Sequence, residues 1–389
     1  MVDSQFRTPI AENIFRHKYA QGPNDSWDIL ARRLVEHVCG TNNGQYPHPL
    51  MSKSDRDQLT MYIKQMKFIP GGRYLYYAGR PLGFFNNCFA LKGEEDTREE
   101  WGNLMKRGSD SLMSGGGIGV DYSIFREEGR LLKRTGGISS GPIPLMQSMN
   151  EMGRNVMQGG SRRSALFASL NWQHGDIQQF LHIKDWSDEI KRLKANDFNF
   201  PAPLDMTNIS INWDDNLNLK DLPDLWHQSV QQMCKTGEPG HCYNFGKNSK
   251  ETLRNACSEF TAEEDSSVCN LGSINFGAIE DIAELSAVVE LAAQFLYCGT
   301  IRGDLPYDKV KQVRDKNRDV GLGLMGLHEW LLKRGKKYEV DEDLKRWLEI
   351  YQLYSEKGAN AIADRFYLPR PRKYRAVAPA GTIGILALN

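Results

Sequence analysis

The feature that most constrains the fold is an alternation of strand and helix patterns from residue 67 to residue 389. Short runs that are largely apolar, such as Cys88 to Leu91 within 86–91, or that alternate, such as 209–211, are typical of buried strands. Between such runs lie segments with apolar residues at helical spacing, for example 143–157 and 341–366. This alternation predicts an α/β domain, and we expect a barrel rather than an open sheet. Residues 1–66 show only helical patterns and are predicted to form a helical N-terminal region.

Composition and charge argue against several classes of protein. The 389 residues are 40% apolar and contain 49 basic and 49 acidic side chains, so nothing favours binding to nucleic acid or to a membrane surface. No uninterrupted apolar run is long enough to span a bilayer, and no signal peptide is read at the start. Seven irregularly spaced cysteines do not suggest a disulfide scaffold. We therefore expect a cytoplasmic protein in which any cysteine pair is catalytic.

An amide, a thiol and a carboxylate occupy alternate positions at Asn255, Cys257 and Glu259. In an extended segment these three side chains would point to the same side. A sulfur, a hydrogen-bonding amide and a titratable acid in one small volume indicate an active site. Cys269 follows after a short loop.

Two glycine-rich segments have alternative interpretations. The run at 115–119 lacks the third glycine of a dinucleotide fingerprint, because position 120 is Val, and it follows a helix pattern. We interpret it as a tight turn that leads into a buried strand. Residues 158–165 combine a flexible backbone with two arginines, which suits phosphates or a base edge, although a solvated basic loop is equally compatible. Around Cys234 and Cys242 the spacing of zinc ligands is lacking, so no metal site is predicted.

Taken together, these motifs resemble the catalytic subunit of ribonucleotide reductases. Asn255-Ala256-Cys257-Ser258-Glu259 matches the family's Asn-x-Cys-x-Glu loop. Other matching segments occur in the same order along residues 60–389: 69–73, 87–89, 114–119, 135–142, 158–165, 269–275, 317–323 and 379–383.

The resemblance implies a ten-stranded α/β barrel of the ribonucleotide reductase and glycyl radical type. Residues 67–389 would supply its first half, the central cysteine loop and the start of its second half. Cys257 would become a thiyl radical that removes the 3′ hydrogen, Glu259 would accept the 3′-hydroxyl proton, and Asn255 would hold the sugar hydroxyls. Cys88 and Cys269 would supply two electrons and close to a disulfide.

Further positions are assigned by the same resemblance. It implies that the substrate binds at Gly71, Gly72, Asn87, Ala380, Gly381, Thr382 and Ile383. It places an allosteric deoxynucleotide near Glu95 and Asp96, with a specificity loop at Gln158, Gly159, Gly160, Ser161, Arg162 and Arg163. The regulatory ATP cone of some relatives is not expected within residues 1–66.

The glycine run and the close spacing of Cys257 and Cys269 are most similar to the class that uses adenosylcobalamin. Ser258 and Ala256 depart from the Gly and Pro that are usual there. An external dithiol such as thioredoxin would restore the reduced cysteines. The substrate would be a ribonucleoside di- or triphosphate, reduced for DNA synthesis, and a homodimer is compatible with the family.

Family members continue beyond the segment at 379–383. The sequence therefore leads us to expect a barrel that is incomplete at its C-terminal side, and a second polypeptide or a spliced segment that completes it. Two alternatives remain open. One is a class I type subunit that needs a separate radical-generating metal subunit, and the other is a non-catalytic nucleotide-binding fragment of a split reductase.

Overall fold

The computed structural model describes residues 6–41, 48–132, 135–157 and 163–388. The chain divides into two compact units. Residues 1–87 and 268–389 form the first unit, and residues 88–267 form the second. Because the second unit is a continuous segment, it interrupts the first unit in the sequence.

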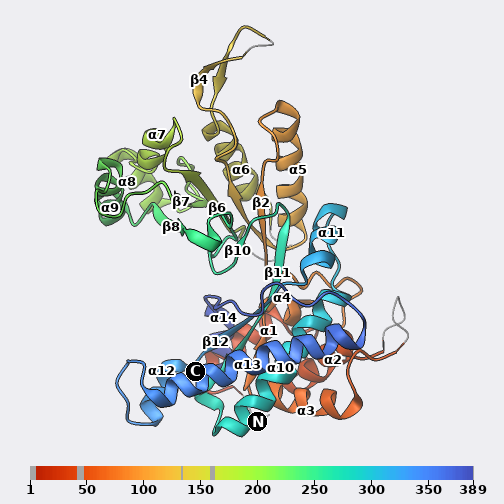
Figure 1. Cartoon of the computed structure of the whole chain (residues 1–389). Coiled ribbons are helices and arrows are strands. Elements are labelled where there is room, and N and C mark those ends of the chain that lie inside the picture. Colours follow the sequence, from red (N-terminus) through yellow and green to blue (C-terminus); the bar gives the residue numbers. More distant parts are fainter. Residues whose placement is uncertain (1–5, 42–47, 133–134, 158–162, 389) are drawn as a thin grey trace. The chain divides into compact units, whose positions relative to one another are not determined.

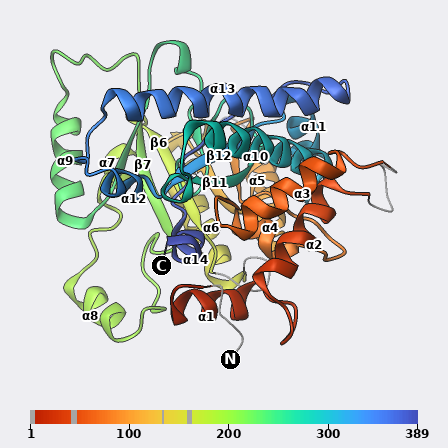
Figure 2. The same ribbon diagram turned by 90° about the horizontal axis from the view of Figure 1, so that it is seen from below.

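The first unit is mainly helical (Figures 1 and 2). Its strands are β1 (Phe68–Pro70), β11 (Ser267–Asn275) and β12 (Val320–Met325); β1 pairs antiparallel and β12 parallel with β11. Its helices are α1 (Pro9–Lys18), α2 (Trp27–Cys39), α3 (Lys53–Lys64), α4 (Gly72–Tyr77), α10 (Ile282–Arg302), α11 (Asp308–Asn317), α12 (Leu327–Lys333), α13 (Glu342–Arg365) and α14 (Gly381–Leu388), with a short 3₁₀ turn at Phe276–Ala278.

Helix α10 is the centre of this unit, and α13 runs along it (Figure 2). The sequence pattern predicts that this helix ends at Gly299, which is wrong, because it continues to Arg302. Gly299 instead makes room for a neighbour, since a Cβ there would overlap the hydroxyl of Tyr74. Among the described helices α10 alone is long and apolar enough to cross a membrane, but about two thirds of that stretch is buried within the protein, as in the core helix of a soluble domain.

The second unit contains five parallel strands in the order of the sequence (Figure 1). They are β2 (Cys88–Lys92), β3 (Gly117–Asp121), β6 (Leu166–Asn171), β7 (Thr207–Asp214) and β8 (Gly240–Asn244). Two antiparallel pairs accompany them, β4 (Glu128–Leu131) with β5 (Ile138–Ser140) and β9 (Leu253–Arg254) with β10 (Thr261–Ala262). The helices are α5 (Arg98–Met113), α6 (Ile143–Asn155), α7 (Ile177–His182), α8 (Asp188–Asn196) and α9 (Asp224–Thr236), with a short 3₁₀ turn at Gly246–Asn248.

The two faces of this parallel sheet differ in polarity. Ile118 and Leu166 point to the side of α5 and α6, because Gly108 of α5 lies against Ile118 and Gly153 of α6 against Leu166. Successive side chains of a strand point to opposite faces, and the strand register extends each face across the sheet. The face away from these helices therefore carries, besides Phe167, mostly polar or small residues: Cys88, Gly117, Gly119, Asp121, Ser169, Ser210, Asn212 and Asn244. We call it the polar face.

The predicted α/β class is confirmed, with β2, β3, β6, β7 and β8 following one another as the strands of half a barrel would. The count of ten strands and the incomplete C-terminal side stay predictions. The glycine run at 115–119 is a turn followed by the fully buried strand β3, as its sequence indicates.

Candidate active site

The three motif residues lie on a tight loop between β9 and β10. An extended segment was expected, and this is wrong. Ser258 has φ +65, its amide donates to the carbonyl oxygen of Asn255 at 3.0 Å, and the Phe260 amide donates to Asn255 Oδ1 at 3.1 Å. The loop folds back on itself because the amide side chain of Asn255 takes the place of a backbone acceptor. Asn255, Cys257 and Glu259 therefore share one tight turn, rather than one side of a strand.

Asn255 and Glu259 present buried polar atoms that the described protein does not satisfy. Asn255 is 0% exposed, and its Nδ2 has no hydrogen-bond partner among the described residues. The two carboxylate oxygens of Glu259 are buried in the same way. Burial raises the pKa of the Glu259 carboxyl, although its own backbone amide and the nearby Asn255 amide oppose this shift. A donor and a proton acceptor without protein partners are typical of a site that a ligand completes.

Cys257 has a different environment from its two neighbours in the loop. Its side chain is exposed at the tip, whereas Ala256 and Phe260 are buried on either side. A sulfur in this position is accessible to a substrate or a cofactor, while the residues that hold the loop are fixed.

Two features fix the base of the loop to the parallel sheet. Arg254 donates from Nη2 to Asn244 Oδ1 of β8 at 2.7 Å and from Nη1 to the carbonyl oxygens of Glu251 and Leu253 at 2.5 and 3.1 Å. On the other side, a Cβ at Gly119 of β3 would overlap the carbonyl oxygen of Arg254. The hairpin therefore lies directly on the polar face. The sequence analysis missed Arg254, for which its place just before Asn255 was the available signal.

Cys88 lies at the start of β2 on the same polar face and is 6% exposed. Its neighbour in the ladder is Gly117, and a Cβ at Gly117 would lie 2.9 Å from the Cβ of Ala256. Strand β3 thus contacts both β2, which carries the predicted redox cysteine, and the loop that carries Cys257.

The remaining substrate and redox positions belong to the first unit. Cys269 is a buried residue of β11, and the Gly71 amide donates to the carbonyl oxygen of Leu271 on the same strand at 2.8 Å. A Cβ at Gly71 would also meet the side chain of Asn87, so these two predicted residues are neighbours. Gly72 begins α4 near the hydroxyl of Tyr19. The pairing of Cys269 with Cys88 stays a prediction.

The segment predicted to meet the substrate phosphates forms the start of α14. Ala380 has φ +50 and precedes the helix, which begins at Gly381. Thr382 is half-buried and Ile383 is buried. The role of this segment in binding substrate phosphates stays a prediction.

The predicted effector positions are described only in part. Glu95 and Asp96 lie in the turn before α5, where Arg126 Nε donates to Asp96 Oδ2 at 2.5 Å. Residues 158–162 of the predicted specificity loop lie outside the described residues. Arg163 is exposed, and its guanidinium lies over the ring of Phe198 at 4.6 Å.

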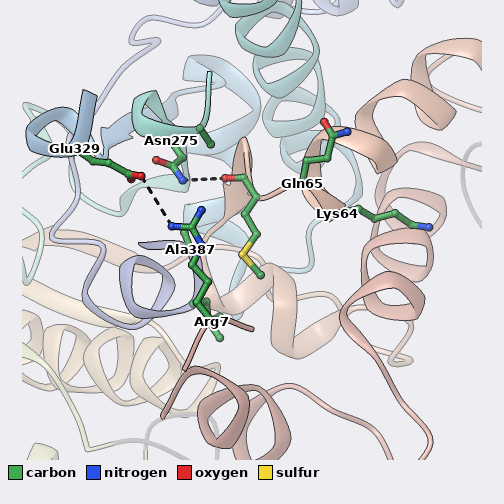
Figure 3. A pocket seen from close by; sticks show the side chains of 9 residues that line it. Arg7, Lys64, Gln65, Asn275, Glu329 and Ala387 are labelled. Carbon is green, nitrogen blue, oxygen red and sulfur yellow. Dashed lines mark hydrogen bonds and ion pairs between the residues drawn. The ribbon is translucent and has the colours of Figure 1, made fainter. Parts of the chain in front are cut away.

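A cavity of about 180 Å³ lies elsewhere in the first unit (Figure 3). Asn275 lines it and donates from Nδ2 to the carbonyl oxygen of Met66 at 3.2 Å, and Arg7 lies 4.0 Å from Glu329. None of the predicted site residues lines this cavity. The described residues contain no group of three or more His, Cys, Asp or Glu side chains suited to a metal ion.

Comparison with known families agrees with this geometry. Residues 86–202 and 212–358 match the model of the ribonucleotide reductase barrel domain. A vitamin B12-dependent ribonucleoside-diphosphate reductase of Thermoplasma acidophilum is 27% identical over 84% of this chain and 47% of its own length. A reductase of the same name from Mycobacterium tuberculosis is 26% identical over 98% of this chain and 60% of its own length.

A ribonucleoside-diphosphate reductase large subunit of Plasmodium falciparum is also similar, with 25% identity over 72% of this chain and 41% of its own length. The chain therefore spans about half the length of these curated relatives. The family model covers well over half of the chain, including the Asn255–Glu259 loop and both Cys88 and Cys269. The chain belongs to the ribonucleotide reductase barrel-domain family.

Proposed function

We propose that this chain reduces ribonucleotides to 2′-deoxyribonucleotides by thiyl-radical chemistry at Cys257. The observation that carries the proposal is the loop in which an exposed thiol stands beside two buried polar side chains with unsatisfied atoms. Family membership supports the reaction type. Because the chain spans only about half the length of its relatives, the activity of the whole protein is itself part of this proposal.

Each loop residue has a role that suits its environment. The Cys257 sulfur, as a thiyl radical, takes the 3′ hydrogen of the ribose. Glu259 accepts the 3′-hydroxyl proton, for which its carboxylate needs only hydrogen-bond reach. Asn255 donates from Nδ2 to a sugar hydroxyl, because its Oδ1 is already occupied by the Phe260 amide.

Cys88 and Cys269 supply the two electrons of the reduction in this proposal. Of the two hydrogens that their thiols give up, one leaves with the 2′-hydroxyl as water and the other is delivered to C2′, while the two sulfurs form one disulfide; Cys257 returns the 3′ hydrogen and Glu259 returns the 3′-hydroxyl proton. Both thiols are buried, at 6% and 2% exposure, which keeps the proposed formation of the disulfide away from bulk water. An external dithiol such as thioredoxin then reduces the disulfide by exchange.

Adenosylcobalamin is the radical source that we propose, and the names of two relatives support it. When bound, this cofactor supplies a carbon-centred radical. The chain's own residues fit such a reaction, because Cys257 stands exposed at the tip of a loop held by Arg254 and Asn244. Cytoplasmic location, a deoxynucleotide effector and substrate phosphates bound at residues 380–383 belong to the same proposal.

The test is an assay of ribonucleotide reduction with adenosylcobalamin and a dithiol. It should be run on this chain alone and with a polypeptide that supplies the remaining part of a full-length relative. Cys257→Ser should abolish turnover, and Cys88→Ser should also prevent deoxynucleotide formation, because the disulfide whose formation supplies the two electrons cannot form. Full activity of Cys257→Ser would contradict the radical assignment.

Binding of cobalamin separates this reading from its main alternative. A class I type subunit should not bind adenosylcobalamin. Activity that appears only with a metal-carrying partner and without cobalamin would favour the alternative.

A further inference from the structure

Two cysteines of the first unit that take no part in the proposed reduction contact each other in its core. Cys39 is the last residue of α2, and Cys298 lies near the end of α10. Both side chains are 0% exposed, and their thiols form a hydrogen bond with each other. The helices α2 and α10 also pack together, so this contact is part of the fold of the unit. Two sulfurs in contact meet the first geometric condition for a disulfide.

Hydrogen bonds to the backbone hold the two helices together at the level of this thiol pair. Arg302, about one helical turn after Cys298, donates from Nη2 to the carbonyl oxygen of Gly40 at 2.8 Å. The Leu50 amide donates to the carbonyl oxygen of Cys39 at 2.9 Å. Because these bonds involve the residues beside the two cysteines, they keep the thiols close to each other.

Burial keeps this pair in its reduced form as long as the core is closed. It raises the pKa of the Cys39 thiol well above its ordinary value, and the hydrogen bond with Cys298 acts in the same direction, against the charges of Arg56 and Arg302. Only a thiolate attacks a disulfide, so oxidation requires an opening that admits water and reagent. Cys39 ends a helix, which opens there at a lower cost than the whole unit, and the two guanidiniums then favour its thiolate.

We propose that Cys39 and Cys298 are a second redox dithiol, which a low-molecular-weight disulfide such as oxidised glutathione converts to an internal disulfide. One cysteine thiolate attacks a sulfur of the reagent and releases one thiolate from it, and the other cysteine then displaces the second. The two protein thiols lose two electrons and two protons, and the reagent becomes two thiols. The inference is independent of the proposed function, because neither residue belongs to the loop at 255–259 or to the predicted pair of Cys88 and Cys269.

The new bond would join two parts of the first unit that are distant in the sequence. It would connect α2, in the N-terminal region, to α10, the central helix of the unit. A disulfide that closes a long segment of chain restricts the unfolded state strongly and stabilises the folded state. We therefore expect oxidation to raise the unfolding temperature of the first unit by roughly 5–15 °C.

Mapping of the disulfides in the unaltered chain is the direct test. The native protein is incubated overnight with oxidised glutathione, the remaining thiols are alkylated, and the peptides are analysed by mass spectrometry with and without a reductant. Trypsin and a glutamate-specific protease are used together, because cleavage after Glu290 separates Cys298 from Cys269 and the residues before it. The expected main product of Cys39 is a peptide pair that joins it to Cys298.

Thermal unfolding in the same oxidant measures the consequence of the bond. The parent chain should show the rise in unfolding temperature, and Cys298→Ala should lose it because no partner for Cys39 remains. Cys234→Ala is the matched control, since Cys234 is an exposed thiol of the second unit, and this variant should keep the rise.

Two results of the mapping would overturn the second dithiol. One is that Cys39 and Cys298 stay reduced while the exposed Cys234 is glutathionylated. The other is that Cys39 joins mainly other cysteines in the native protein, as it would in urea-unfolded chains. A cross-link without a rise in unfolding temperature would overturn its stabilising role. The mapping needs no turnover, so a chain that reduces no ribonucleotide would contradict the proposed function and leave this test valid.

Discussion

At the scale of single residues, the burial of Glu259 should determine at which pH the rate of the proposed reaction falls on acidification, which is the acid limb of its pH profile. Its pKa is raised by desolvation, so a larger share of the carboxyl is protonated, and inactive as a base, at mildly acidic pH. The rate of reduction should therefore rise with pH, with its midpoint above the pKa of an ordinary glutamate. Glu259→Gln should remove this limb and lower kcat roughly 10²- to 10⁴-fold. A pH profile of kcat measures both, and an acid limb that persists in Glu259→Gln would assign it to another group.

Asp319 is a second buried carboxyl, and it affects stability rather than chemistry. Burial raises its pKa from 3.8 to about 6, against the opposing charges of Arg372 and Lys373. Between pH 4 and 6 the folded state binds more protons than the unfolded state, so Asp319 lowers stability as pH rises through this window. This pKa shift corresponds to a loss of about 3 kcal/mol in the free energy of unfolding between the two ends of this pH window.

Asp319→Asn tests this prediction, because the amide can still accept the 2.9 Å hydrogen bond from the Lys373 amide. Urea unfolding at several pH values should show a smaller loss of stability above pH 4 in Asp319→Asn than in the parent. Glu342→Gln, at a side chain that is 94% exposed, is the control and should leave the pH dependence unchanged. If stability fell with pH in parallel for Asp319→Asn and the parent, the pH dependence could not be assigned to Asp319.

At the scale of elements, the hairpin β9–β10 depends on the absence of a side chain at Gly119. An alanine Cβ would overlap the carbonyl oxygen of Arg254, so Gly119→Ala must displace either the hairpin or β3. We expect a loss of about 1–3 kcal/mol in unfolding free energy and a large loss of reduction, since Asn255 follows Arg254 directly. Gly102→Ala is the control. Gly102 lies exposed within α5 with nothing near its Cβ position, so this change should stabilise the protein by about 0.5–1 kcal/mol.

The same hairpin shows which parts of the site the sequence could predict. Asn255, Cys257 and Glu259 could be identified because their residue types and spacing are local. The shape of the loop could not, because it depends on a serine at positive φ and on an amide side chain that replaces a backbone acceptor. Helix α2 was predictable to within a residue from its cap Ser26 and from Gly40, whereas Gly299 was misread because its neighbour Tyr74 is distant in the sequence.

At the scale of the whole molecule, the two units divide the proposed chemistry. The second unit carries Cys257 with its two partners and Cys88, and the first carries Cys269 and the segment 380–383. Neither unit holds the whole set, so reduction requires both. The effector recognition proposed at Glu95, Asp96 and Arg163 would need only the second.

This division predicts that residues 88–267 fold alone. They are continuous in the sequence, their strands β2, β3, β6, β7 and β8 each pair with the next one along the chain, and α5 and α6 cover the apolar face. Apart from Phe167, the opposite face bears mainly small or polar side chains, such as Asp121, Ser169 and Asn212, which tolerate water when uncovered. The fragment should show cooperative thermal unfolding by circular dichroism and bind a deoxynucleotide without reducing any ribonucleotide. Residues 268–389 should not fold alone, because β11 pairs with β1 and α10 contacts α2 and α3. A cooperative transition in the fragment 268–389 but not in the fragment 88–267 would contradict this prediction.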